Sequence, residues 1–110
     1  MQFANDDQSR LEHLLTSFDQ ERETEYGGER YLVRDNGAVC RLNPFRKRAR
    51  PLDKKWTFGQ QIRSSGYMHI AGVRVHRIVC SAFHGEPPTE RHVVDHIDTN
   101  RANNRPENLR

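Results

Sequence analysis

The first part of the chain spaces its apolar residues as an amphipathic helix does. Apolar positions recur at i, i+3, i+4 and i+7, namely Leu11, Leu14, Leu15 and Phe18. Asp6 or Asp7 can cap the start and Gly27-Gly28 ends the pattern, so we predict a helix over residues 6–25. We expect its apolar stripe to dock on the rest of the domain. Binding to a partner protein or to a second copy is the alternative.

Short strands are predicted after this helix. Residues 31–34 and 38–42 flank Asp35-Asn36-Gly37, and an Asn-Gly pair tolerates the positive φ of a hairpin turn. Pro44 and Pro51 mark residues 43–55 as a loop. Extended segments then follow, separated by turns that contain glycine, and we expect them at residues 56–63, 67–70 and 73–75.

The spacing becomes helical again at Val75. A second helix is predicted from the apolar set Val75, Ile78, Val79, Ala82 and Phe83, and it ends at Gly85 before Pro87-Pro88. The apolar residues before Asp95-His96 predict another strand. The expected fold class is therefore α+β, with small antiparallel strands and an N-terminal helix.

The composition limits the core and excludes several classes of protein. With 110 residues, of which 34% are hydrophobic and 30% charged, the chain has room for one small domain. No apolar run is long enough to span a membrane, and residues 1–15 do not resemble a signal peptide, so we expect a cytoplasmic protein. Cys40 and Cys80 form no CxxC pair, which argues against a structural zinc site and leaves a disulfide open.

The charge is divided unevenly along the sequence. Residues 1–29 hold eight acidic and two basic side chains, a net charge of −6, whereas residues 30–110 hold sixteen basic and seven acidic ones, a net charge of +9. Six basic residues fall within ten positions of the predicted loop: Arg46, Lys47, Arg48, Arg50, Lys54 and Lys55. Such a loop can lie along a phosphate backbone, so we favour contact with DNA over a merely solvated charged face.

Candidate hydrolytic chemistry is concentrated near the end of the chain. The His96 imidazole can accept a proton near neutral pH, as a general base must, and the Asp95 carboxylate is a ligand for a hard metal ion. The Asn108 amide can orient the base without titrating. In a regular strand, Asp95 and His96 would point to opposite faces, so a shared site requires a strand end or an irregular backbone.

Three segments together resemble the HNH endonucleases, most closely the homing and phage-encoded branch. They are residues 75–85 (VHRIVCSAFHG), 94–101 (VDHIDTNR) and 103–109 (NNRPENL). Residues 29–39 also resemble the small module that often precedes the nuclease motif in that branch. The similarity covers residues 29–110. It implies a ββα-metal (His-Me finger) site that nicks or cuts DNA with one divalent ion, Mg²⁺ first and Mn²⁺ as the alternative.

The resemblance also implies roles for single residues. His96 matches the general base, Asn108 the asparagine that orients it, and Asp95 the metal-binding acid. Asn104 matches a position that fixes the loop. Arg105 matches a phosphate-facing position, and Arg101 is also expected to contact DNA, which adds two residues to the expected DNA contacts.

The sequence departs from the family at its end. In HNH endonucleases a further helix supplies another metal ligand, an Asn or His, whereas this chain stops at Arg110. We expect a truncated form of a complete protein rather than a decayed relative, because the motif residues present are intact. The predicted parts are an acidic amphipathic helix (1–28), a β-rich DNA-binding module with the basic loop (29–74) and the incomplete nuclease motif (75–110).

Three functions remain open at this point. The first is a metal-dependent DNA endonuclease that hydrolyses phosphodiester bonds. The second is a non-catalytic DNA-binding module with a vestigial nuclease motif. The third is a protein-interaction domain that uses the stripe of Leu11 and Phe18. The sequence specifies no oligomeric state.

Overall fold

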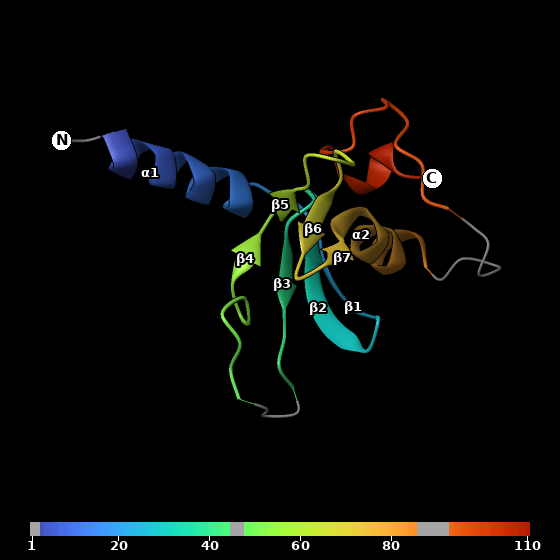
Figure 1. Cartoon of the computed structure of the whole chain (residues 1–110), viewed down its shortest axis with the longest axis horizontal. Coiled ribbons are helices and arrows are strands. Elements are labelled where there is room, and N and C mark those ends of the chain that lie inside the picture. The colour runs from blue at the N-terminus through green and yellow to red at the C-terminus, as the bar shows by residue number, and fades with distance from the viewer. Residues whose placement is uncertain (1–2, 45–47, 86–92) are drawn as a thin grey trace.

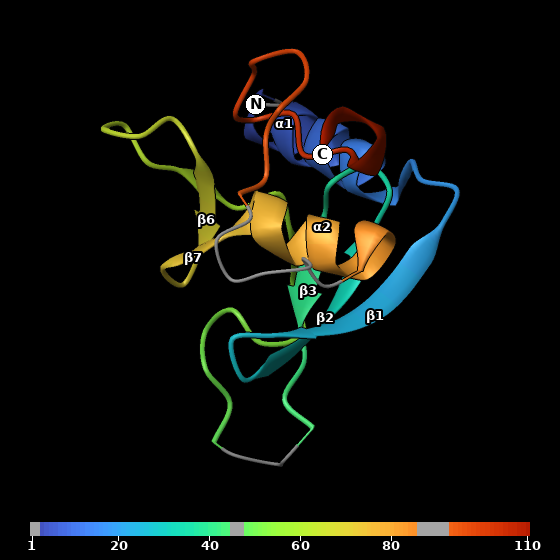
Figure 2. The same ribbon diagram turned by 90° about the vertical axis from the view of Figure 1, so that its right-hand side faces the viewer.

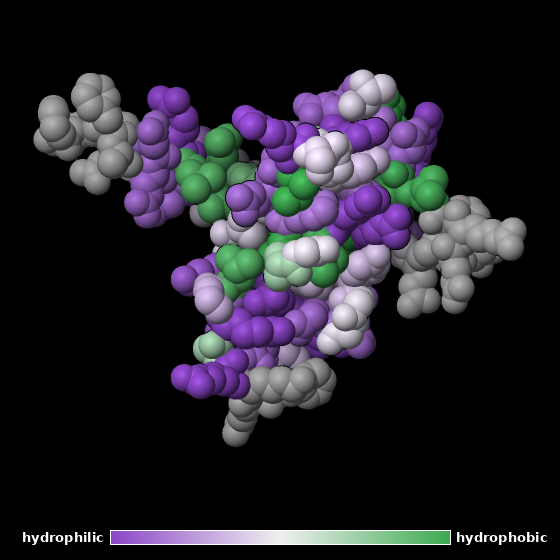
Figure 3. Space-filling view, in the orientation of Figure 1, coloured by the Kyte–Doolittle hydropathy of each residue, from purple (hydrophilic) through white to green (hydrophobic). Residues whose placement is uncertain are grey.

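The structure is a computed structural model that describes residues 3–44, 48–85 and 93–110. Two small sheets and one helix form the body, and helix α1 (Phe3–Thr16) extends away from it (Figure 1). The α+β class with small antiparallel sheets is therefore confirmed. Within the described residues no helix is long and apolar enough to cross a membrane. Figure 3 shows a largely hydrophilic face with small apolar areas.

The first sheet has the order β1-β2-β3-β4, and every pairing is antiparallel. Its strands are β1 (Glu21–Tyr26), β2 (Glu29–Arg34), β3 (Val39–Arg41) and β4 (Trp56–Thr57). The predicted hairpin is confirmed, because β2 and β3 pair with Val33 opposite Val39. Gly37 closes the turn at a φ of 91°, and the Arg34 N–H donates to the Ala38 carbonyl at 2.9 Å.

Strand β1 corrects the prediction of a single helix over residues 6–25. The helix ends at Thr16, and residues 21–26 pair along their whole length with β2. Glu21 forms an ion pair with Arg34 at 3.1 Å, and Glu23 and Glu25 both pair with Arg30. Pairing with the next strand, across the Gly27-Gly28 turn, thus overrides the local helical pattern. The expected boundary between residues 28 and 29 falls in the turn that joins β1 to β2.

The apolar stripe of α1 does not dock on the core as expected. Leu11 is 48% and Leu14 51% exposed. The end of the helix is held by polar contacts instead, since the Asn36 amide donates to the carbonyl oxygens of Leu14 and Leu15 at 2.9 and 3.1 Å. This one asparagine of the β2–β3 turn therefore satisfies two carbonyls that the helix end leaves without partners.

The second sheet, β5-β6-β7, leads directly into helix α2 (Val75–His84). Its strands are β5 (Gln60–Gln61), β6 (Met68–Ile70) and β7 (Val73–Arg74). The region predicted as extended over residues 56–63 is divided between β4 and β5 at Gly59. Gly59 has a φ of 94°, and a Cβ there would lie 2.8 Å from the His69 carbonyl oxygen, so the close approach of the two segments requires glycine.

Helix α2, predicted from its spacing, is confirmed and carries the core. It lies across the first sheet (Figure 2), where Ser81 hydrogen-bonds Thr24 of β1 at 2.7 Å. The buried cluster joins it to both sheets and to the C-terminal segment: Tyr31, Val33, Val39, Ile70, Val75, Ile78, Val79 and Leu109. The core is thus small, as the composition predicts, and it ends beneath the Asp95-His96 segment.

The strand predicted around Asp95-His96 is reduced to an isolated antiparallel bridge between His96 and Leu109. Backbone hydrogen bonds from Asp95 to Arg110 and from Ile97 to Asn108 support it at 2.9 and 2.8 Å. Beyond it, side chains of Asp98 and its asparagine neighbours bond to the backbone and replace the ladder of a regular strand. A short 3-10 helix, η1 (Pro106–Asn108), closes the segment. The complete ββα-metal motif stays a prediction.

Candidate functional site

The His96 imidazole lies inside the protein, in a small group of rings. It is 5% exposed, and its ring centroid is 5.0 Å from that of His76, which meets it edge-on at 66°. Tyr67 packs against both, at 4.8 Å from His76 and 6.0 Å from His96. Three segments thus surround the His96 imidazole. They are the His96–Leu109 bridge, the first turn of α2 and the residue just before β6.

Asn104 determines which nitrogen of His96 is basic. Its Oδ1 atom lies 2.8 Å from His96 Nε2. A carboxamide oxygen only accepts hydrogen bonds, so Nε2 carries the hydrogen. In the neutral ring the lone pair then belongs to Nδ1, which is the atom that can take a proton from water.

Asn104 is itself held in place by the hairpin of the first sheet. It is 4% exposed, and a Cβ at Gly37 would lie 3.2 Å from both its backbone carbon and its backbone oxygen. The β2–β3 turn therefore packs directly against the loop that orients His96. The loop that orients His96 is thus in direct contact with the first sheet.

Asn108 does not make the contact expected of it. Its amide nitrogen donates to Asp98 Oδ1 at 2.9 Å and to the Asn103 carbonyl at 2.8 Å, so both amide hydrogens are used in the loop. Its Oδ1 accepts from the Asp98 N–H at 3.1 Å. Orientation of the His96 ring falls to Asn104, and loop fixing, which was expected of Asn104, falls to Asn108.

Asp98 is the centre of this loop, although no separate role was predicted for it. Its carboxylate accepts from the Asn103 side chain, the Asn100 N–H and Asn108, at 2.8, 2.8 and 2.9 Å. These hydrogen bonds, that of Asn103 first, lower the pKa of Asp98. The carboxylate stays ionised and holds the asparagine loop rigid from within.

Asp95 lies on the opposite side of the segment from His96. Its side chain is 59% exposed and bonds Arg110 at 3.1 and 3.2 Å, whereas His96 is buried. The two adjacent side chains thus diverge, as in a strand. This exposed carboxylate can bind a metal cation only if its ion pair with Arg110 breaks.

The donor set fits a weakly held metal ion rather than a preformed metal centre. Over residues 3–44, 48–85 and 93–110, no group of three or more His, Cys, Asp or Glu side chains is arranged to hold a metal. Mg²⁺ usually retains several waters and binds through one or two carboxylates together with substrate phosphates. Asp95 alone is compatible with that mode, in which the substrate supplies part of the coordination.

His76 is a buried histidine of helix α2. It is 2% exposed, and its Nδ1 atom is buried without a hydrogen-bond partner. Burial, and next the neighbouring His96, lower the pKa of His76 to about 4. A neutral His76 therefore lies against His96 at physiological pH.

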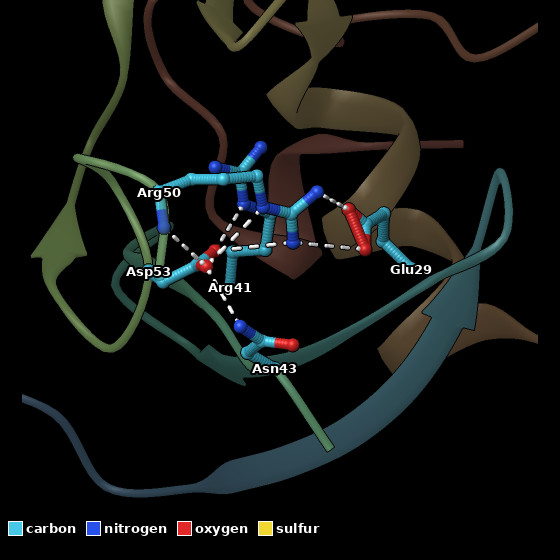
Figure 4. Close-up of polar contacts among 5 residues, drawn as sticks. All are labelled: Glu29, Arg41, Asn43, Arg50 and Asp53. Carbon is cyan, nitrogen blue, oxygen red and sulfur yellow. Dashed lines mark hydrogen bonds and ion pairs between the residues drawn. The ribbon is translucent and has the colours of Figure 1, made fainter. Parts of the chain in front are cut away.

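The basic loop is anchored by an internal ion network (Figure 4). Asp53 bonds Arg41 at 2.8 Å and the Arg50 N–H at 3.0 Å, and Arg50 also pairs with Glu29 at 2.6 Å. The backbone hydrogen bond from Arg50 is the first cause that holds the pKa of Asp53 well below its usual range. Asn43 completes the network through a hydrogen bond to Asp53 at 3.2 Å.

The predicted DNA contacts therefore fall into three groups. Arg50 is engaged in the network, where it anchors the loop. Arg46 and Lys47 lie outside the described residues. The remaining members are exposed: Arg48, Lys54, Lys55, Arg101 and Arg105.

Arg101 contacts a residue that the sequence did not single out. Its guanidinium lies over the Tyr67 ring, with Cζ 4.5 Å from the ring centroid, and it also donates to the Ser65 carbonyl. Arg74 lies over the same ring at 4.7 Å. No local pattern marked Arg74 or Tyr67, because the three residues come from separate parts of the chain.

Comparison with known proteins identifies the segment that holds His96. Residues 73–110 match the family model described as HNH endonuclease. No curated protein and no solved structure matches the chain. The matched segment begins at β7 and includes α2, Asp95, His96 and the asparagine loop. The resemblance to the HNH endonucleases that was inferred from the sequence is thereby confirmed for residues 73–110, which are similar to that family.

Proposed function

We propose that the protein is a DNA endonuclease that hydrolyses phosphodiester bonds with the help of one divalent metal ion. The observation that carries the proposal is the hydrogen bond between Asn104 and His96 within the HNH segment. It leaves His96 Nδ1 with a lone pair and a fixed direction, which is what a general base needs. Mg²⁺ is the proposed ion because a single carboxylate, water and phosphate suit it.

In the proposed reaction His96 Nδ1 accepts the proton of the attacking water. The Nε2–H bond to Asn104 stays in place as the ring becomes positive, so the imidazolium form keeps a partner. Asp95 would hold the metal ion. Its positive charge would offset the negative charge on the pentacovalent phosphate and on the leaving 3′ oxygen. For this to happen Arg110 must leave Asp95, and the Asp95 side chain must turn toward the phosphate that His96 serves, because the two side chains diverge in this structure.

The anchored loop supplies the proposed contacts with the DNA backbone. Arg48, Lys54 and Lys55 are exposed, and Asp53 holds the loop through its buried bonds to the backbone and to Arg41. Each phosphate that such a side chain neutralises adds affinity that falls with salt. Arg105, exposed on the loop between His96 and Leu109, is a further proposed contact.

Relaxation of supercoiled plasmid in Mg²⁺ tests the proposal. We expect the wild-type chain to nick the plasmid, and His96→Ala to bind DNA with unchanged affinity but to lose nicking. His13→Ala removes an exposed histidine of α1 and serves as the matched control. Equal nicking by His96→Ala and His13→Ala would remove His96 from the reaction.

A binding-only function is the second candidate, and two observations favour it. His96 is 5% exposed, so water reaches its ring poorly, and Asp95 is already paired with Arg110. This candidate predicts salt-dependent DNA binding without a metal requirement, and no nicking by any variant. Nicking by the wild-type chain that disappears in His96→Ala excludes it.

A further inference from the structure

Two arginines from distant segments stack on one tyrosine beside His96. Tyr67 begins the approach to β6, Arg74 ends β7, and Arg101 belongs to the asparagine loop. Their Cζ atoms lie 4.7 and 4.5 Å from the Tyr67 ring centroid. Both arginines are exposed, whereas Tyr67 is half-buried. We call Arg74 and Arg101 the arginine pair.

The stacking prepares both guanidinium groups for an anion. A cation over an exposed aromatic face gains about 0.5–1 kcal/mol, and the planar group keeps its N–H edge free for hydrogen bonds. Arg101 is held further by its bond to the Ser65 carbonyl. Two positive charges gathered at one ring also attract an anion to that part of the surface.

The segment that supplies Tyr67 and Arg74 is basic. Residues 54–85 contain five Lys or Arg side chains and no Asp or Glu: Lys54, Lys55, Arg63, Arg74 and Arg77. This stretch supplies β4 to β7 and helix α2. Asp98 is the acid of the loop that carries Arg101, and its carboxylate is engaged by Asn100, Asn103 and Asn108. The positive charge of the segment favours a polyanion as the partner of Arg74 and Arg101.

The surface beside the arginine pair is concave. A depression of about 390 Å³ is lined by Gln61, Ile62, Arg63 and Gly66. The turn that forms it projects beyond the sheets (Figure 2) and is held by the hydrogen bond from the Gly66 N–H to the Ile62 carbonyl at 2.7 Å. Arg101 closes one side, since its Cδ lies 3.5 Å from where a Cβ on Gly66 would be.

We propose that Arg74 and Arg101, held on Tyr67, bind a backbone phosphate of the DNA strand that His96 cleaves, next to the scissile phosphate. The centroid of the Tyr67 ring is 6.0 Å from that of His96, so an anion bound there lies beside the hydrolytic group. Arg63 then faces the strand where it crosses the depression. This inference rests on the proposed nuclease function and names the contact that seats its substrate.

The salt dependence of DNA binding tests the proposal without cleavage. A labelled DNA duplex is titrated with the full chain in EDTA at several NaCl concentrations. Each phosphate contact contributes about 0.9 to the slope of log affinity against log salt. We expect Arg74→Gln and Arg101→Gln each to reduce the slope, and the double variant to reduce it by about this amount. Arg10→Gln removes an exposed charge from α1 and should leave the slope as it is.

Tyr67 separates a positioning role from a simple loss of charge. Tyr67→Leu removes the ring without changing the net charge, and we expect weaker binding because the two guanidinium groups are no longer held. Tyr67→Phe restores the ring and should recover the affinity that Tyr67→Leu loses. Thermal unfolding of each variant identifies any that fail to fold, and Arg74 is a suitable site because its side chain makes no capping hydrogen bond to α2.

The outcomes distinguish this site from the nuclease itself. Slopes for Arg74→Gln and Arg101→Gln that equal that of Arg10→Gln overturn the arginine pair, even if the wild-type chain nicks DNA. Reduced slopes in a chain that never nicks DNA support the phosphate contact and overturn the hydrolytic function. Failure of Tyr67→Phe to recover binding overturns the role of the ring.

Discussion

Truncation of the Asn104 side chain perturbs the proposed base, His96, without changing the histidine itself. The side chain is 4% exposed and accepts a hydrogen bond from His96 Nε2 at 2.8 Å. Asn104→Ala leaves that buried N–H without an acceptor, which costs about 1–3 kcal/mol of unfolding free energy. For a domain of this size each kcal/mol lowers Tm by about 4–8 °C, so the expected fall is roughly 4–20 °C.

The same substitution should impair cleavage. Without its acceptor the His96 ring can adopt either tautomer and either orientation, so Nδ1 no longer faces the water reliably. The loss is bounded by the factor of about 10²–10⁴ that general base catalysis supplies. Urea unfolding followed by circular dichroism measures the stability, and plasmid nicking in Mg²⁺ measures the rate.

Asn104→Asp is the matched control, because it keeps an acceptor for the Nε2 hydrogen in a side chain of the same size. We expect it to unfold at a higher urea concentration than Asn104→Ala. The reasoning is refuted if Asn104→Ala is as stable as the wild-type chain and nicks plasmid at the same rate.

Three further substitutions test how the site is supported. Gly37→Ala places a Cβ 3.2 Å from the Asn104 backbone, whereas Gly72→Ala has a similar positive φ but open space around it. We therefore expect Gly37→Ala to lose more stability and more nicking activity than Gly72→Ala. Equal losses of stability in urea unfolding would contradict this. His76 has a pKa lowered to about 4, so the folded chain should lose stability as the pH falls from 6.5 toward 4, by up to about 3 kcal/mol. His76→Phe should abolish that part of the pH dependence in urea unfolding, and an unchanged slope would rule out a neutral His76. Asp53→Asn leaves a buried arginine unpaired and should cost about 3–5 kcal/mol, whereas Glu25→Gln on the exposed β1 should cost under about 1 kcal/mol; a similar small cost for both would show that the network does not stabilise the loop.

The elements that could be predicted are those with local signals. The Asn36-Gly37 turn requires a positive φ at glycine, and the structure has φ 91° there. Helix α2 follows its apolar spacing, because the same residues that set the pattern are buried. In both cases the local preference and the packing agree.

The predictions that failed concern which segments pair with one another. Gly27-Gly28 was interpreted as the end of a helix, whereas it is the turn across which residues 21–26 pair with β2. Arg50 belongs to a basic run, yet its partners Glu29 and Asp53 neutralise it, and only the fold brings Glu29 near. Charge spacing along a chain does not show which charges are already paired.

The site was predicted in part. The sequence located His96 and its asparagines, but it could not say which amide reaches the ring, since Asn104 and Asn108 share one loop and one chemistry. Gly37, in the β2–β3 turn, packs against the Asn104 backbone, and this contact between separate segments leaves no local signal in the sequence. His76 and Tyr67 were missed for the same reason, because only the packing of α2 and β6 places their rings beside His96.

The protonation of the two His96 ring nitrogens can be observed by long-range ¹H–¹⁵N NMR of the free chain, at a pH where imidazole is neutral. The hydrogen bond from His96 to Asn104 Oδ1 requires a protonated Nε2 and a bare Nδ1. The predicted result is a spectrum of a single tautomer with the hydrogen on Nε2. In Asn104→Ala we expect both tautomers to be populated. A hydrogen on Nδ1 would leave His96 without a base in the proposed direction and would contradict the hydrolytic mechanism.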